Sequence, residues 1–169
     1  MQNESVYVFI DSQNLNLSIK KLGWELDFKI FYKYLKTKFH AEKIFLFLGF
    51  ISKNKNLYSF LKKCGYEIIF KPTINYRNNK TEFIKGNIDA ELVLYSMIEY
   101  DNYSKFIIIS GDGDFYCLIE YLNNKNKLQN IIIPNKNRYS SLLRKYRKYF
   151  FYIDNLKTKL EKWDKKEAE

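Results

Sequence analysis

Acidic residues directly follow two short apolar stretches of this sequence. Asp11 comes after residues 6–10, and Asp112 and Asp114 come after residues 106–109. In an open parallel sheet, functional groups collect beyond the carboxyl ends of the strands, where the strand order reverses. Asp89, at the start of a further apolar segment, supplies another acidic element. If these side chains share one crevice, their carboxylates can hold a metal ion.

Carboxylates that are brought together repel one another, by roughly 4 kcal/mol for a pair 4 Å apart at an effective dielectric constant of 20. A divalent cation removes that cost, and oxygen-only ligation favours Mg²⁺ or Mn²⁺ over zinc. We expect Asp11, Asp89, Asp112 and Asp114 to converge within about 8 Å as metal ligands and catalytic residues. Such a cation can activate a water molecule for attack on phosphorus.

The charge of the chain fits a phosphodiester substrate. It carries 29 Lys and Arg against 19 Asp and Glu, a formal net charge of +10, and such a field attracts polyanions. The base composition of the encoding genome is an alternative source of this lysine excess. An acidic metal site inside a basic shell favours nucleic acid.

Each aspartate also has a structural explanation when taken alone. Asp11 could cap a helix that starts at Asn14, and Asp114 could cap one that starts at Phe115. Asp89 could simply reflect the preference of acids for helix N-termini. The glycines on both sides of Asp112 favour the functional interpretation, because they allow a tight turn that aims carboxylates around one point.

A mechanism based on histidine or cysteine has little support. His40 is the single histidine and lies near the predicted end of a helix, so a Ser-His-Asp or Cys-His arrangement is not indicated. Cys64 and Cys117 lie far apart without CxxC spacing. We expect both to be reduced core residues.

Short apolar runs that alternate with helical patterns predict an α/β domain with a parallel sheet. The runs are rich in Ile, Val and Phe, as strands buried on both faces should be. The predicted strands span residues 6–10, 44–50, 67–70, 106–110 and 130–133, with 150–153 as a sixth, short one.

Helical spacing is found between these strands. Gly65 should stop one of the helices, and the helix at 88–100 should be largely covered by neighbours because apolar residues occupy several of its faces. The predicted helices span residues 28–39, 57–64, 88–100, 115–122 and 140–147.

Length and composition predict one compact domain in a soluble, cytoplasmic protein. The chain has 169 residues, of which 46% are hydrophobic, which suits a single core. The longest strongly apolar run, 44–51, is eight residues, against the roughly 20 needed to cross a membrane. Residues 1–4 lack the basic start of a signal peptide. We expect a catalytic domain at 1–154 and a basic helical tail at 155–169.

Sequence motifs of a known family occur in the expected order. They are Phe9-Ile10-Asp11-Ser12-Gln13-Asn14-Leu15, Lys85-Gly86-Asn87-Ile88-Asp89-Ala90-Glu91-Leu92 and Ser110-Gly111-Asp112-Gly113-Asp114-Phe115. With these segments, residues 5–154 resemble the NYN domain of the LabA-like group, within the PIN-like nuclease superfamily. Ser12 stands where the family usually has Gly.

The resemblance implies a Rossmann-like three-layer α/β/α sandwich with a mainly parallel sheet of five or six strands. It implies that the aspartates named above bind the metal, with Asn14 and Ser110 supporting the site. Glu91 is a further candidate acid, with a surface helix charge as the alternative. Family members are typically metal-dependent ribonucleases.

Basic residues outside the acidic motifs are candidates for substrate binding. Lys85 could contact a substrate phosphate, and Arg77 and Lys80 lie in a segment long enough to reach over a crevice. Arg144 and Arg147 alternate with tyrosines, a pattern that suits phosphate contacts and base stacking on single-stranded nucleic acid. A solvated helix face is the alternative for that stretch.

These observations favour a metal-dependent endoribonuclease acting on single-stranded or unpaired RNA. A weakly active or non-catalytic RNA-binding or scaffold protein is the alternative. A Toprim-type or phosphatase-like metal enzyme fits less well, because Asp11-Ser12-Gln13 matches neither first motif. Leu156, Leu160 and Trp163 keep helical spacing and could form a homodimer contact.

Overall fold

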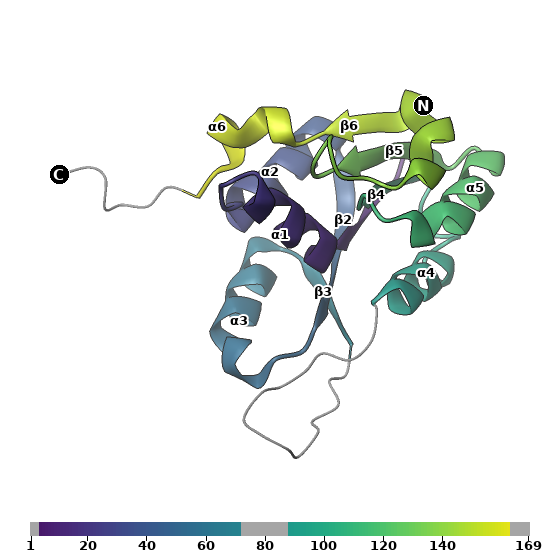
Figure 1. The fold of residues 1–169 in the computed structure, drawn as a ribbon. Helices are drawn as coiled ribbons and strands as arrows, with labels where there is room; N and C mark the ends of the chain where they lie inside the picture. The colour runs from purple at the N-terminus through teal and green to yellow at the C-terminus, as the bar shows by residue number, and fades with distance from the viewer. Residues whose placement is uncertain (1–3, 72–87, 163–169) are drawn as a thin grey trace, which may run out of the picture.

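A six-stranded, all-parallel sheet forms the centre of the molecule, in the order β3-β2-β1-β4-β5-β6 (Figure 1). The computed structural model describes residues 4–71 and 88–162. The strands are β1 (Val6–Asp11), β2 (Ala41–Gly49), β3 (Glu67–Lys71), β4 (Lys105–Ile109), β5 (Leu128–Ile133) and β6 (Phe150–Tyr152). The predicted α/β fold with a Rossmann-like parallel sheet is confirmed, including the sixth strand.

The strand order reverses between β1 and β4. The chain runs outward from β1 through β2 to β3, and then returns to β4 on the other side of β1. The register pairs Ile10 with Ile109, so the residues that follow, Asp11 and Ser110, lie side by side. This is the position at which open parallel sheets place their ligands.

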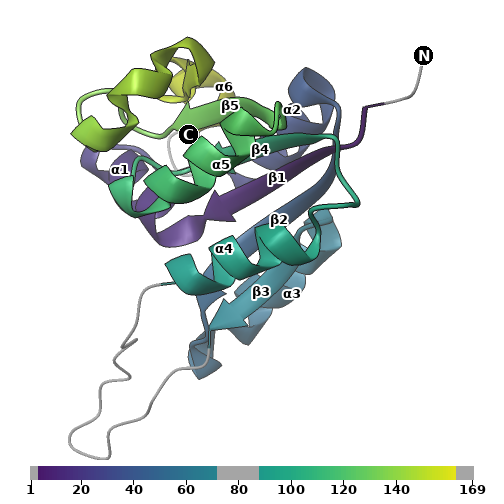
Figure 2. The same cartoon turned by 90° about the vertical axis from the view of Figure 1, so that its right-hand side faces the viewer.

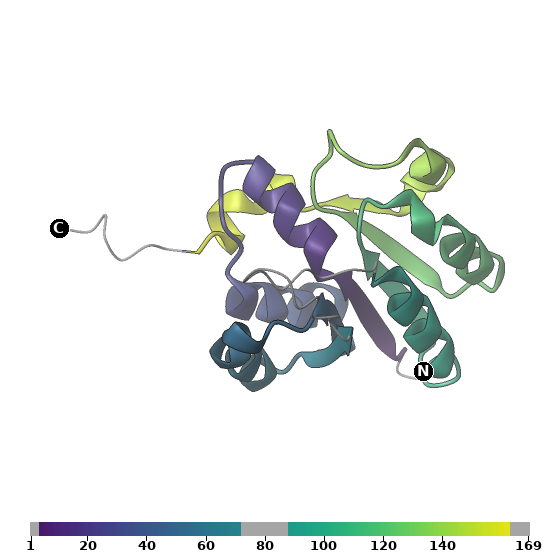
Figure 3. The same cartoon turned by 60° about the horizontal axis from the view of Figure 1, so that its bottom comes forward.

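Helices cover both faces of the sheet (Figures 2 and 3). One face carries α1 (Ser12–Lys21), α2 (Phe28–Phe39), α3 (Lys55–Cys64) and α6 (Lys157–Leu160), and the other carries α4 (Asp89–Ile98) and α5 (Tyr116–Asn124). The 3₁₀ segments are η1 (Ser52–Asn54), η2 (Gly113–Phe115), η3 (Ser141–Tyr149) and η4 (Asp154–Leu156).

Alternate residues of each central strand supply two separate cores. Val8 and Ile10 point to the face with α1 and α2, whereas Tyr7 and Phe9 point to the face with α4 and α5. The second core is rich in stacked rings, and Phe9 lies 4.8 Å from Phe106 between ring centroids. Because both faces are covered, the strands read as continuous apolar runs.

Three local predictions differ from the structure. The segment after Ser140 is a 3₁₀ segment, η3, rather than an α-helix, with a non-helical residue at Tyr146. Helix α4 buries only one side: Leu94 and Ile98 are exposed, because this helix packs on the sheet without a second layer outside it. Cys117 is exposed on α5 rather than in the core.

The ends of two helices follow from backbone geometry. Gly65 ends α3 in the left-handed region, at φ 111°, which confirms the predicted stop. His40 ends α2 at φ 54°, a conformation that non-glycine residues adopt rarely. The single histidine is therefore a helix-terminating residue.

The C-terminal segment packs against the domain. Leu160 is fully buried in the core beneath α1 and α2, and its carbonyl accepts a hydrogen bond from the Asp27 N–H at 2.8 Å. Glu161 forms an isolated antiparallel bridge with Leu26. The predicted homodimer contact is therefore wrong at Leu160, because this side chain is buried in the chain's own core. Trp163 lies outside the described residues.

Within residues 4–71 and 88–162, no helix combines the length and the apolar character needed to cross a lipid bilayer.

Leu160→Ala should reveal how strongly the C-terminal segment stabilises the domain. Deleting a fully buried leucine side chain costs about 2–5 kcal/mol of unfolding free energy. Leu17→Ala is the matched control, because Leu17 is 51% exposed and its truncation should change stability by about 0.5 kcal/mol or less. Urea denaturation measures both variants. Equal stability of the two would show that the segment is not part of the fold.

Candidate metal centre

Asp11, the last residue of β1, is a buried carboxylate with a defined set of partners. It is 4% exposed. One oxygen accepts the Asn14 N–H at 3.0 Å, which caps α1, and the other accepts the Ser110 hydroxyl at 3.1 Å. Burial raises the pKa of Asp11, these hydrogen bonds lower it, and the nearby charge of Asp112 raises it again. Asp11 is thus both a helix cap and a charge placed at the crevice.

Ser110 and Asn14 join β1 to the turn that follows β4. The Ser110 hydroxyl accepts the Asp112 N–H at 3.1 Å while it donates to Asp11. The Asn14 side-chain oxygen accepts the Gly111 N–H at 3.0 Å. These bonds fix the backbone of the turn relative to Asp11, and the sequence placed both residues next to the acids.

Asp89, Asp112 and Asp114 form a three-aspartate cluster. Each contributes a carboxylate oxygen, and these oxygens all lie within 4.8 Å of one another. Asp112 and Asp89 are half-buried and Asp114 is exposed. Asp11 lies next to the cluster, connected to Asp112 through Ser110.

Two structural features bring the cluster together. The Asp112 carboxylate accepts the Asp114 N–H at 3.0 Å, which orients both acids in one short turn. Asp89 opens α4, and the buried side chains of Ile88 and Leu92 hold that end of the helix on the sheet. Acids are also favoured at a helix N-terminus, so the position of Asp89 is compatible with the structural explanation as well as with a metal-binding role.

The chemistry of the donors suits a hard divalent cation. Every member of the cluster offers carboxylate oxygen and none offers nitrogen or sulfur, as Mg²⁺ and Mn²⁺ prefer. Three carboxylates this close repel one another unless a cation or protons neutralise them. The cluster could therefore bind a metal ion.

The glycines of the turn have a different role from the one expected. Neither Gly111 nor Gly113 adopts a positive φ. Instead, a Cβ atom at Gly111 would lie 3.0 Å from the Arg138 carbonyl oxygen, and one at Gly113 would collide with the Ser140 side chain. The glycines are needed because the segment after β5 packs directly on the turn.

Glu91, Arg144 and Arg147 were also predicted for the site, and none of them belongs to the three-aspartate cluster. Glu91 forms an ion pair with Lys71 at 3.3 Å. Arg144 and Arg147 are exposed on η3, and Arg147 donates a hydrogen bond to the Tyr139 hydroxyl at 3.2 Å. Arg77, Lys80 and Lys85 lie outside the described residues.

Sequence reasoning missed the segment that follows β5. An open cavity of about 680 Å³ is lined by Asn14, Asp112 and Asp114. Residues 137–140 and Leu142 line it as well. The position of this segment after a parallel strand was the available signal. The segment contains no acidic residue that would mark it as part of the site.

Asp11→Asn should expose the cost of the buried charge. The pKa of Asp11 is higher in the folded chain than in the unfolded chain, so ionised Asp11 lowers stability increasingly as pH rises through that window. Asparagine removes the charge and keeps an acceptor for the cap. Without divalent cations, we expect the variant to melt above wild type near pH 7 and the difference to shrink toward about pH 4.

Asp27→Asn is the control for this experiment, because Asp27 caps α2 through hydrogen bonds to two backbone N–H groups and is only half-buried. It should show a smaller difference from wild type. A gain for Asp11→Asn that does not change with pH would contradict the electrostatic explanation.

Comparisons with known proteins agree with this architecture. The NYN domain family matches residues 5–154. The low amplitude and bright protein LabA of Synechococcus elongatus is 26% identical over 125 residues, which cover 70% of this chain and 67% of that protein. The crystal structure of a Vibrio parahaemolyticus protein of unknown function has a TM-score of 0.71 at 23% identity, over 92% of this chain and 98% of that one. The match across both strand ends that carry the aspartates shows that the chain belongs to the NYN domain family, within the PIN-like superfamily.

Proposed function

We propose that the protein is a metal-dependent endoribonuclease that hydrolyses phosphodiester bonds of single-stranded or unpaired RNA. The observation that carries the proposal is the convergence of the Asp89, Asp112 and Asp114 oxygens within 4.8 Å. The choice of RNA follows the resemblance to PIN-like ribonucleases. Binding without cleavage is the alternative function.

Asp89, Asp112 and Asp114 would hold Mg²⁺ or Mn²⁺, with Asp11 beside them. When bound, the cation would lower the pKa of a water molecule and offset the negative charge of the phosphate in the transition state. The hydrogen bonds of Ser110 with Asp11 and Asp112 fix the position of the turn. Such preorganisation matters because groups that are already in place need not rearrange during the reaction.

The surroundings of the acids allow a polymer to approach. The cavity beside Asp112 and Asp114 measures about 680 Å³, within the range of ligand-binding sites. The net charge of +10 favours association with a polyanion. Arg144 and Arg147 on η3, and Arg77, Lys80 and Lys85 in the central part of the sequence, remain proposed phosphate contacts.

Asp112→Asn should separate catalysis from binding. The amide keeps the oxygen that accepts the Asp114 N–H but removes a charge that would hold the metal. Cleavage of a labelled single-stranded RNA in Mn²⁺ should fall by on the order of 10²-fold or more. RNA affinity measured in EDTA should persist or increase slightly, because repulsion of the phosphates decreases.

Asp101→Asn is a charge-matched control, since Asp101 is exposed and follows α4 at the far end of that helix from Asp89. It should cleave RNA at the wild-type rate. Undiminished cleavage by Asp112→Asn would show that Asp112 only shapes the turn. RNA binding by the wild-type protein without any cleavage in Mg²⁺ or Mn²⁺ would support the alternative function.

A further inference from the structure

The segment after β5 forms part of the wall of the cavity beside the acids. Residues 137–140 line the same 680 Å³ cavity as Asp112 and Asp114. The family motifs do not include this segment, and its basic member, Arg138, is absent from the binding residues expected from the sequence.

The backbone of this wall is fixed to the turn that carries the acids. The Ser140 N–H donates to the Gly111 carbonyl at 2.9 Å, and the Arg138 N–H donates to the Asn135 carbonyl at 3.0 Å. Asn135 is 3% exposed, and its side-chain oxygen accepts the Asn137 N–H at 3.0 Å. The main-chain position of Arg138 relative to the turn is therefore set by the fold.

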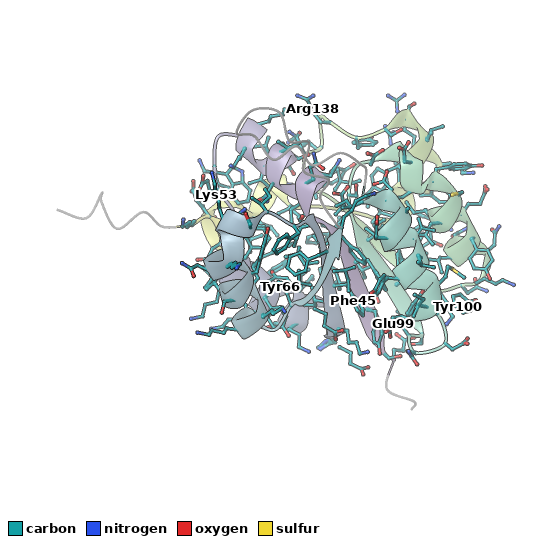
Figure 4. All side chains as sticks on the ribbon, turned by 90° about the horizontal axis from the view of Figure 1, so that it is seen from below. Phe45, Lys53, Tyr66, Glu99, Tyr100 and Arg138 are labelled. Carbon is teal, nitrogen blue, oxygen red and sulfur yellow. The ribbon has the colours of Figure 1, made fainter. Side chains whose placement is uncertain are left out.

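The Arg138 guanidinium is available to a ligand. It is exposed, and it makes no hydrogen bond or ion pair with any residue in the described part of the chain. In contrast, Arg147 bonds to the Tyr139 hydroxyl and Lys145 bonds to Glu120 at 2.6 Å. Figure 4 shows Arg138 at the opposite end of the molecule from Glu99 and Tyr100, which lie where α4 ends.

We propose that Arg138 binds a non-scissile phosphate of the nucleic acid, a neighbour of the phosphate that is cleaved beside the aspartates. This inference rests on the proposed function and extends it to the substrate class: a strand with at least two phosphodiesters. The acids repel any phosphate that no cation neutralises, so the adjoining phosphate needs a positive partner. The planar guanidinium offers paired N–H donors that match a phosphate.

A base is a poorer occupant of this position. Tyr139, the ring beside Arg138, packs edge-on against Phe150 with 5.2 Å between centroids. Its hydroxyl is also bound by Arg147. The Tyr139 ring therefore already packs against other residues of the protein. The group that remains to contact the ligand is the Arg138 guanidinium.

Substrates with one or several phosphates test the proposal. For Arg138→Ala, kcat/KM on an RNA oligonucleotide should fall about tenfold to a hundredfold, as expected for loss of a hydrogen bond to a charged group. On bis(4-nitrophenyl) phosphate, which has a single phosphodiester, kcat/KM should equal that of wild type. Lys62→Ala, at an exposed position of α3, should change neither value.

RNA binding in EDTA supplies a readout that needs no catalysis. The slope of log affinity against log salt concentration should become less negative by about 0.7 for Arg138→Ala, the value for one phosphate contact on a single strand. Lys62→Ala should keep the wild-type slope.

The outcomes distinguish this inference from the proposed function. If the wild-type protein cleaves neither substrate, the proposed function fails and the salt slope alone decides whether Arg138 contacts a phosphate. Equal losses on the oligonucleotide and on the small diester would overturn the inference, because Arg138 would then act on the acid cluster itself. An unchanged salt slope would also overturn it.

Discussion

The burial of the Asp11 charge constrains the rest of the site. A carboxylate removed from water is costly unless it is hydrogen-bonded, and its two oxygens are satisfied from different elements, by α1 and by the end of β4. Ser110 can donate to Asp11 only with its oxygen facing the turn, where it accepts the Asp112 N–H. One buried charge therefore determines where the Gly-Asp-Gly-Asp turn lies.

The Gly-Asp-Gly-Asp turn also positions the segment that lines the cavity with it. Its carbonyl at Gly111 holds Ser140, and the absence of side chains at both glycines lets residues 138–140 pack against it. The main-chain segments that carry the acids and the arginine are thus parts of one packed unit rather than independent loops. Such a unit keeps residues of opposite charge around one cavity, as recognition of two positions along one chain would require.

Periodicity predicted the sheet well because its strands are buried on both faces, so that runs such as 106–109 contain no polar interruption. It could also place acids at strand ends, since that position depends on the order along the chain. It could not show that Leu160 fills the core or that Glu91 pairs with Lys71, because both depend on which distant segments meet. Arg138 was missed for the same reason: its importance comes from packing on Gly111, 27 positions earlier in the numbering.

The large positive charge has more than one use. Lys127 donates to the carbonyls of Tyr100 and Tyr103 at 2.6 Å each and lies 4.1 Å from the centre of the Tyr100 ring. Lys43 pairs with Glu99 at 3.4 Å. These cations contact residues at the end of the sheet where β4 begins, away from the aspartates, so a count of lysines overstates the charge available to a substrate. What bears on binding is a cation that lines the same cavity as the acids and has no partner in the described structure, and Arg138 meets both conditions.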